Sequence, residues 1–155
     1  MNTALENSHT LRTEMNRIAA YLPEYETVMN IYGVGEMLGP QLLAEIGDTR
    51  RFHSRRAITA YFGYDSEPND LGDHVSKSNP ITKKGSSAVR RTLFIIMTTL
   101  IQTQPADNPV YQFLDKKRSE GKHYYCYMTA ASNKFLRIYY AKVNDVLSAQ
   151  KSPSS

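Results

Sequence analysis

Apolar residues recur along the chain at helical spacing, and this periodicity constrains the fold more than any other feature. Leu11, Met15, Ile18 and Leu22 are separated by four, three and four residues, which places them on one face of a helix. Further helical segments are expected over 37–46, 54–62, 87–104, 109–121 and 128–149. No segment alternates apolar and polar residues over the length of a strand. The sequence therefore predicts an all-α fold, a small helical domain preceded by an amphipathic helix.

Helix ends are marked by residues that stop or cap a helix. Gly47 and Gly63 are expected stops, Ser54 is a candidate N-cap, and Asn108-Pro109 is typical of a helix start. Pro40 falls one turn into its helix, where a missing amide is expected to cost little because the first amides lack intrahelical partners. Residues 64–85 have no lasting periodicity and are expected to form the longest loop.

Composition excludes several classes of protein. A chain of 155 residues with 41% hydrophobic residues is expected to form one domain with an ordinary core. The single cysteine, Cys126, excludes an internal disulfide and a thiolate zinc cage, and the four histidines lack ligand spacing. The longest apolar run, Leu93 to Ile101, is short and contains two threonines. These features predict a cytoplasmic protein with no membrane partner.

The charge is divided unevenly between the two halves of the chain. Residues 1–74 contain six Lys and Arg against eleven Asp and Glu, whereas residues 75–155 contain thirteen against four. Lys77, Lys83, Lys84, Arg90 and Arg91 lie in a stretch, 75–106, that has no carboxylate. Such a stretch suits a phosphate backbone. A solvated basic face with no ligand is the alternative interpretation.

The segment Ile31-Tyr32-Gly33-Val34-Gly35 lies between two expected short helices and has the form of a helix-hairpin-helix. In such a hairpin the glycines permit a tight turn and let backbone amides approach a phosphate, while the next helix N-terminus adds partial positive charge. An αα-turn whose glycines serve geometry alone fits the residues equally well. Gly33, Val34 and Gly35 are therefore candidate DNA contacts with two open interpretations.

Three further groups of residues have a chemical and a structural interpretation. The arginines of the first group are either phosphate contacts or exposed charges. The carboxylates of the expected loop, the second group, are better explained by turn formation than by metal binding. Most tyrosines of the third group are expected to pack in the core, and base stacking is the lesser alternative. The groups are Arg50, Arg51, Arg55 and Arg56; Asp65, Glu67, Asp70 and Asp73; and Tyr124, Tyr125, Tyr127, Tyr139 and Tyr140.

Longer motifs carry a resemblance to a known family. GVGEMLGPQLLAEIGDTRRFHSRRAITAYFGYD, then ITKKGSSAVRRTLFIIM, then NPVYQFLDKKRSEGK and SNKFLRIYYA follow one another in this order. Together they resemble the C-terminal transposase domain of the insertion-sequence one-ten family over about Leu22 to Val146. The resemblance implies a DNA recombinase whose relatives use a noncoding bridge RNA to choose their sites. DNA is therefore the first expected partner and bridge RNA a further one.

Relatives of this kind combine an N-terminal RuvC-like domain with an acidic DEDD metal site, a helical connector, and a C-terminal domain that supplies a serine nucleophile. The resemblance implies the end of the connector at 1–23, the transposase domain at 24–147 and a disordered tail at 148–155. The chain is accordingly expected to be a truncated copy. Magnesium is expected for the RuvC-like domain, and no cofactor for this chain.

The resemblance also locates the expected nucleophile. The family serine stands just before a glycine that corresponds to Gly72, so its position is occupied by Leu71. Leucine has no nucleophilic atom, and a phosphoserine link to DNA cannot form there. Ser66, Ser76 and Ser78 lie in the same loop, but their spacing favours none of them. The expected set of catalytic residues in this chain is therefore empty.

Two other functions remain open. In the first, the chain is a non-enzymatic helical module that associates with a second copy or with a full-length transposase and regulates it. In the second, it is a helix-hairpin-helix DNA repair protein, which would need a catalytic Lys or Asp after the hairpin, where only Asp48 stands.

Overall fold

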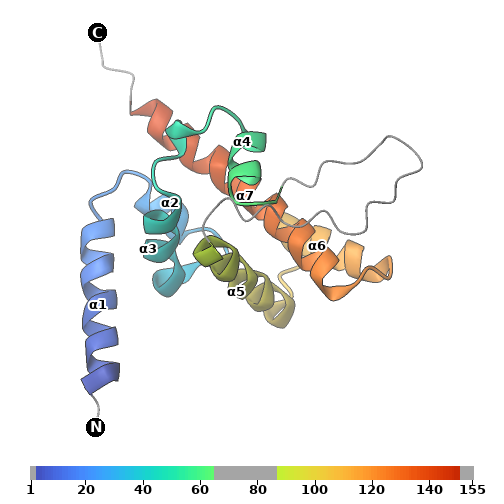
Figure 1. The fold of residues 1–155 in the computed structure, drawn as a ribbon, viewed down its shortest axis with the longest axis horizontal. Coiled ribbons are helices and arrows are strands. Elements are labelled where there is room, and N and C mark those ends of the chain that lie inside the picture. The colour runs from blue at the N-terminus through green and yellow to red at the C-terminus, as the bar shows by residue number, and fades with distance from the viewer. Residues whose placement is uncertain (1–2, 65–86, 151–155) are drawn as a thin grey trace.

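The computed structural model describes residues 3–64 and 87–150, and every regular element in these ranges is a helix (Figure 1). This confirms the predicted all-α fold. The elements are α1 (Thr3–Ala19), α2 (Tyr25–Met29), α3 (Gly35–Ile46), a 3-10 turn η1 (Thr49–Arg51), α4 (Arg55–Tyr61), α5 (Ser87–Thr103), α6 (Pro109–Ser119) and α7 (Tyr124–Ala149).

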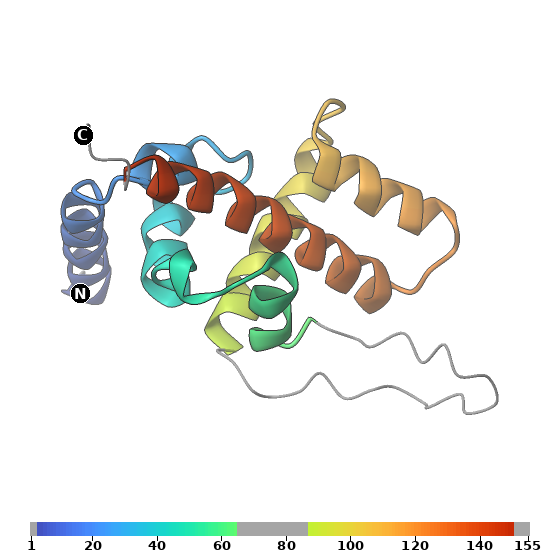
Figure 2. The ribbon, with the colours of Figure 1, turned by 90° about the horizontal axis from the view of Figure 1, so that it is seen from above.

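Helix α7, with 26 residues, runs through the molecule, and α4, α5 and α6 pack along it (Figures 1 and 2). Helix α6 folds back along the first part of α7, and Lys134 of α7 lies over the Phe113 ring of α6, 4.9 Å from its centroid. Helices α4 and α5 also pack on α7, while α2 and η1 contact it less extensively. Helix α1 stands at one end of the molecule and packs on α3.

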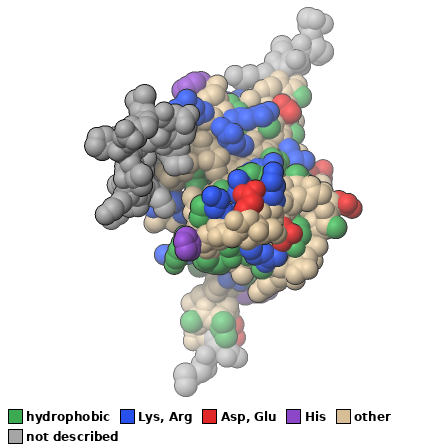
Figure 3. All heavy atoms as spheres, turned by 90° about the vertical axis from the view of Figure 1, so that its right-hand side faces the viewer, with side chains coloured by type: hydrophobic (Ala, Val, Ile, Leu, Met, Phe, Trp, Pro, Cys, Tyr) green, Lys and Arg blue, Asp and Glu red, His purple; other side chains and the backbone are tan. Residues whose placement is uncertain are grey.

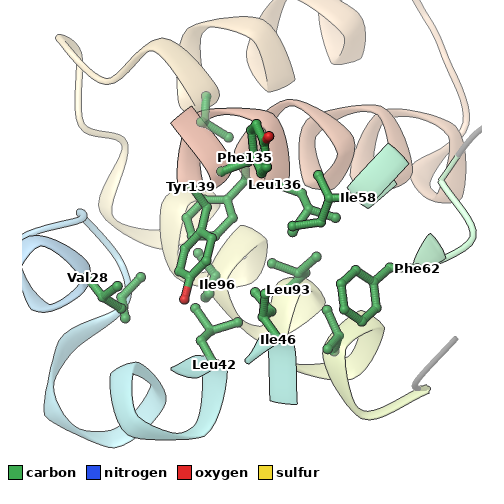
Figure 4. Packing of buried hydrophobic residues seen from close by; sticks show 14 of the residues in the cluster. Val28, Leu42, Ile46, Ile58, Phe62, Leu93, Ile96, Phe135, Leu136 and Tyr139 are labelled. Atoms are coloured by element: carbon green, nitrogen blue, oxygen red, sulfur yellow. The ribbon is translucent and has the colours of Figure 1, made fainter. Parts of the chain in front are cut away.

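One hydrophobic core joins α2, α3, α4, α5 and α7 (Figure 4). Tyr139 and Phe135 of α7 meet Ile96 of α5 and Leu42 of α3 in its centre, and all four side chains are at most 2% exposed. Packing at this density supplies the main favourable free energy of folding, since apolar burial contributes roughly 25 cal/mol per Å². The core therefore fixes the position of each helix that carries a candidate contact.

Predicted caps are observed where the structure describes them. The Ser54 hydroxyl accepts the Ala57 amide at 3.0 Å, and the Asn108 side chain accepts the Tyr111 amide at 2.9 Å. Gly47 ends α3 with a φ of 71°, a conformation that a side chain would disfavour. These local signals act within a few residues, which explains why the sequence alone indicates them.

The first and last helices differ from their expected bounds. Helix α1 begins eight residues before Leu11, because the polar stretch before it has no helix breaker, and it ends at Ala19 rather than at Leu22. The amides of Tyr21 and Leu22 instead close two tight turns, and Leu22 precedes Pro23, a position that disfavours helix. Helix α7 begins at Tyr124, four residues before the expected Met128. It ends at Ala149, so Ser148 and Ala149 are helical and not part of a tail.

Pro40 is a further difference, because it is the sixth residue of α3 and not in its first turn. An amide at this position would normally bond to the Glu36 carbonyl. The Asn16 side-chain amide of α1 donates to that carbonyl at 3.1 Å, and the Asn16 oxygen accepts the Tyr25 hydroxyl at 3.3 Å. The proline thus leaves an acceptor that helps to dock α1 on α2 and α3.

Candidate nucleic-acid interface

The predicted hairpin is the turn between α2 and α3. Gly33 and Gly35 have φ values of 88° and 62°, a region that glycine enters at little cost. Val34, between them, is 3% exposed and packs in the core. Two helices and a glycine turn therefore do occur here, as the sequence predicts, but this geometry by itself does not decide between a phosphate-binding hairpin and an ordinary turn.

Close packing explains two glycines of this unit. A Cβ on Gly33 would lie 3.2 Å from the Ile96 Cγ2 atom of α5, and a Cβ on Gly39 would collide with the Met29 sulfur of α2. Both contacts are with side chains of the molecule itself. Gly33 therefore serves the fit of the hairpin against α5, whereas a Cβ on Gly35 would meet nothing within 4 Å. Gly35 is the hairpin glycine whose surroundings leave room for a ligand.

The N-terminus of α3 begins at Gly35 and is exposed, so its first amides are accessible to a ligand. These amides and the helix dipole favour an anion at this end. Glu36, an exposed carboxylate in the same turn, acts in the opposite sense on an approaching phosphate. The electrostatics of the hairpin are therefore mixed.

Arg90 and Arg91 lie in the first turn of α5 but point in different directions. The Arg90 guanidinium is 3.4 Å from the Phe62 carbonyl at the end of α4, whereas Arg91 is exposed. Ile96 and Leu100, next to Gly33, lie roughly 140° to 180° around the helix from Arg91, given 100° per residue. The hairpin and Arg91 therefore occupy different sides of α5.

The other predicted site residues lie outside the described residues. They are Leu71, Lys77, Lys83 and Lys84, together with the alternative serines Ser66, Ser76 and Ser78 and the loop carboxylates Asp65, Glu67, Asp70 and Asp73. Within the described residues, no group of three or more His, Cys, Asp and Glu side chains is placed to hold a metal ion.

The arginines after α3 divide between structural contacts and exposed charge. Arg50 pairs with Asp48 at 2.7 Å. Arg51 lies over the Phe52 and Tyr61 rings, 4.4 and 4.9 Å from their centroids, and donates to the Ile46 carbonyl. Arg55 and Arg56 begin α4 and are exposed. Arg55 is therefore a better candidate phosphate contact than Arg50 or Arg51.

A cationic cluster that we did not predict lies at the end of α6. It comprises Lys116, Lys117 and Arg118, and cations at a helix C-terminus are favoured by the helix dipole. Lys117 pairs with Glu120 at 3.3 Å, and Arg118 with Asp115 at 2.6 Å. Figure 3 shows this side of the molecule, where basic side chains surround a few acidic ones. The run KKR in the sequence is the signal that indicates this cluster, but two of its three charges are balanced within the chain.

Some of the tyrosines are buried, as core packing requires, and others are exposed, as base stacking would require. Tyr139 and Tyr140 are buried in the core, whereas Tyr124 and Tyr125 are 47% and 74% exposed. Tyr64 is also buried, and burial raises its pKa to about 12, which keeps its hydroxyl protonated at neutral pH. Tyr64 is therefore a packing residue, while Tyr124 and Tyr125 have faces that a ligand can reach.

Within residues 3–64 and 87–150, the helices, the glycine turn between α2 and α3 and the exposed cations belong to an all-α domain. The family model of the transposase family IS116/IS110/IS902 matches residues 25–112, more than half of the chain. The chain belongs to this family, which supports a function related to transposition. The match runs from α2 to the first turn of α6 and thus includes the hairpin and α5.

Comparison with curated proteins and with solved structures gave no match for the chain. A helix that crosses a bilayer needs a long apolar run, and no helix within residues 3–64 and 87–150 provides one.

Proposed function

We propose that this chain is the DNA-binding C-terminal domain of a transposase and acts in DNA transposition and recombination. The observation that carries the proposal is the family match, because it spans the hairpin and the helix of Arg91. The cations of the second half of the chain support it, since phosphate contacts dominate the affinity of proteins for DNA. In this arrangement, residues 1–23 are the end of a connector and residues 24–147 the domain itself.

The proposed contacts are the amides around Gly35 together with Lys77, Lys83, Lys84 and Arg91. Such contacts hold the phosphate backbone and read little of the base sequence. Arg90 stands apart from this set, because its guanidinium is within reach of the Phe62 carbonyl. Bridge RNA is a second proposed partner, on the resemblance alone.

Salt dependence of binding tests this proposal. We expect the chain to bind duplex DNA with little sequence preference, and the Lys83→Ala, Lys84→Ala, Arg91→Ala variant to bind more weakly. The slope of log affinity against log salt should become shallower by about 0.9 for every phosphate that the variant no longer neutralises. Fluorescence anisotropy with a labelled duplex at about 50 to 200 mM salt measures both quantities.

The matched control removes three cations elsewhere, Arg12, Arg17 and Arg50, two on α1 and one paired with Asp48. It should keep the wild-type slope. Equal slopes for the wild-type chain and the first variant would show that this basic stretch is a solvated face and would overturn the proposed contacts.

We further propose that the chain does not cleave DNA by itself, because the resemblance places Leu71 at the position of the family nucleophile. Attack on phosphorus needs a nucleophilic side-chain atom, and the side chain of leucine has none. On the resemblance, we assign magnesium to the RuvC-like domain, where it would stabilise the charge that develops on a transferring phosphate.

A second candidate function is supported by α1. Leu11 and Ile18 are 65% and 56% exposed, and Ala19 is the one buried residue of this helix. An exposed apolar stripe favours association. In this function the chain pairs through α1 with a second copy or with a full-length transposase and regulates it without chemistry of its own.

A further inference from the structure

Four aromatic rings form a continuous surface cluster where α5 meets the start of α7. Tyr124 is the centre of the cluster, with ring centroids 6.4 Å from Phe94, 5.5 Å from Tyr125 and 5.6 Å from Tyr127. Phe94 also lies 6.2 Å from Tyr125. We call these four residues the aromatic platform. The three ring pairs that include Tyr124 are edge-to-face, with interplanar angles of 61° to 81°, so these rings do not stack face to face on one another.

The platform lies at the edge of the core, because Phe94 and Tyr127 pack against the core while the two other rings extend to the surface. Tyr125 is 74% exposed and Tyr124 is 47% exposed, while Phe94 and Tyr127 are half-buried. Ile95, next to Phe94 on α5, is 46% exposed and widens the apolar surface. Core packing does not require four neighbouring rings at a surface, and such a patch is typical of a binding site.

Two basic residues, Arg91 and Lys122, stand near the platform residues in the sequence. Arg91 is exposed and precedes Phe94 by three residues on α5, which places the two side chains on the same face of that helix. Lys122 and His123 are exposed and immediately precede Tyr124. No carboxylate occurs in 87–106 or in 121–144, the two segments that carry these residues. Glu120, two residues before Lys122, pairs with Lys117. Rings with cations and without acidic residues suit an aromatic anion that carries phosphate.

We propose that the aromatic platform binds unpaired bases of single-stranded DNA, with Tyr125 and Tyr124 stacking on the bases and Arg91 and Lys122 contacting the adjoining phosphates. The proposal rests on the proposed function, because it takes DNA as the ligand of the domain. It adds a preference for strand that is not base-paired, since the faces of paired bases are covered by their neighbours in the duplex. Every base has a π-face, so this kind of contact tolerates any sequence.

The platform also lies apart from the hairpin. Phe94 is on the Arg91 side of α5, away from Ile96 and Leu100, which contact Gly33. A strand on the platform would therefore lie on a different side of α5 from a ligand at the Gly35 amides. Strand exchange exposes unpaired bases, and the platform supplies a surface that shields them.

Binding of a labelled oligothymidine to the full chain tests the proposal. Tyr125→Ala should weaken this binding at least fivefold, because removal of one ring that stacks on a base has roughly that effect. Tyr125→Phe keeps the ring and should bind like the wild-type chain. Tyr21→Ala is the matched control, since Tyr21 is 81% exposed and belongs to a different surface. Circular dichroism of each variant checks that the helices are retained.

Two further ligands separate stacking from charge. An abasic oligonucleotide of the same length has the phosphates without the bases, and the wild-type chain should bind it at least as weakly as Tyr125→Ala binds oligothymidine, because Tyr124 also loses its base. Duplex DNA should bind to Tyr125→Ala as it does to the wild-type chain. If the wild-type chain binds duplex DNA but Tyr125→Ala binds oligothymidine as tightly as the wild-type chain does, the proposal for the platform is overturned and the proposed function stands. If the wild-type chain binds neither DNA, the proposed function is overturned as well. Equal weakening in Tyr125→Phe, or tighter binding of oligouridine than of oligothymidine, would overturn stacking on DNA.

Discussion

Single residues in the hairpin have distinct physical roles, although the sequence presents two equivalent glycines. Gly33 has a φ of 88° and lies against Ile96, so both its backbone and the space around it require glycine. Gly35 has a φ of 62°, but its surroundings are open. The requirement at Gly33 is therefore one of packing and conformation together, and at Gly35 one of conformation alone.

We predict that Gly33→Ala destabilises the chain more than Gly35→Ala does. A left-handed backbone costs an alanine about 1 to 2 kcal/mol, and crowding against Ile96 adds about 1 kcal/mol at Gly33 only. Urea denaturation followed by circular dichroism measures the free energy of unfolding of each variant. Equal destabilisation would show that Ile96 yields without cost.

The same pair of variants reports on DNA binding. If the hairpin amides contact phosphate, Gly35→Ala should weaken duplex binding by more than its small change in stability explains. Unchanged binding by folded Gly35→Ala would favour the interpretation of this unit as an ordinary αα-turn.

At the scale of elements, α1 is the helix with the least support from the rest of the molecule. It packs on α3 through Ala19 and through the Asn16 side chain, which bonds to the carbonyl freed by Pro40. Leu11, Met15 and Ile18, the helical residues of its apolar stripe, are between 38% and 65% exposed. The stripe is therefore not explained by burial in this domain, and its spacing of four and three residues suits pairing with another helix.

We predict that the chain is a dimer and that Leu11→Asp together with Ile18→Asp makes it a monomer, because two carboxylates would be buried in the apolar contact. Light scattering after size-exclusion chromatography measures the mass. The control, His9→Asp together with Thr13→Asp, adds the same charge on the opposite face of α1 and should leave the dimer intact. A dimer that persists in the first variant would exclude α1 as the interface.

At the scale of the whole molecule, α5 separates two surfaces. Gly33 and the hairpin lie on one side of it, and Arg91 with the aromatic platform lies on another. The proposed contacts thus form two regions and not one continuous site.

We predict that the chain, incubated with labelled donor DNA and magnesium, forms no covalent link to DNA. Leu71→Ser restores a hydroxyl at the expected position, and this variant should capture DNA only when a relative's RuvC-like domain is added to supply the metal site. Denaturing gel electrophoresis detects a protein-linked band. A band from the unmodified chain alone would assign the nucleophile to Ser66, Ser76 or Ser78.

The sequence by itself determined what depends on neighbouring residues. Helical periodicity, the Ser54 and Asn108 caps and the Gly47 stop act over a few residues, so the all-α fold and most helix ends could be predicted, and the ordered motifs identified the family. The late start of the expected last helix was an error, since the spacing of Tyr124, Tyr127, Met128 and Ala131 is already helical. The contact of Tyr124 and Tyr125 with Phe94, in contrast, is tertiary.

Only the tertiary structure decided which side of each helix is free. A stripe such as Leu11 to Leu22 has the same spacing whether it is buried or exposed. The sequence likewise does not distinguish Tyr139, which is buried in the core, from Tyr125, which is exposed. The separation of Arg91 from Gly33 depends on how α5 is rotated against the hairpin, and the acceptor for Asn16 depends on Pro40 in another helix. Such properties arise from contacts between distant segments, and local sequence patterns do not encode them.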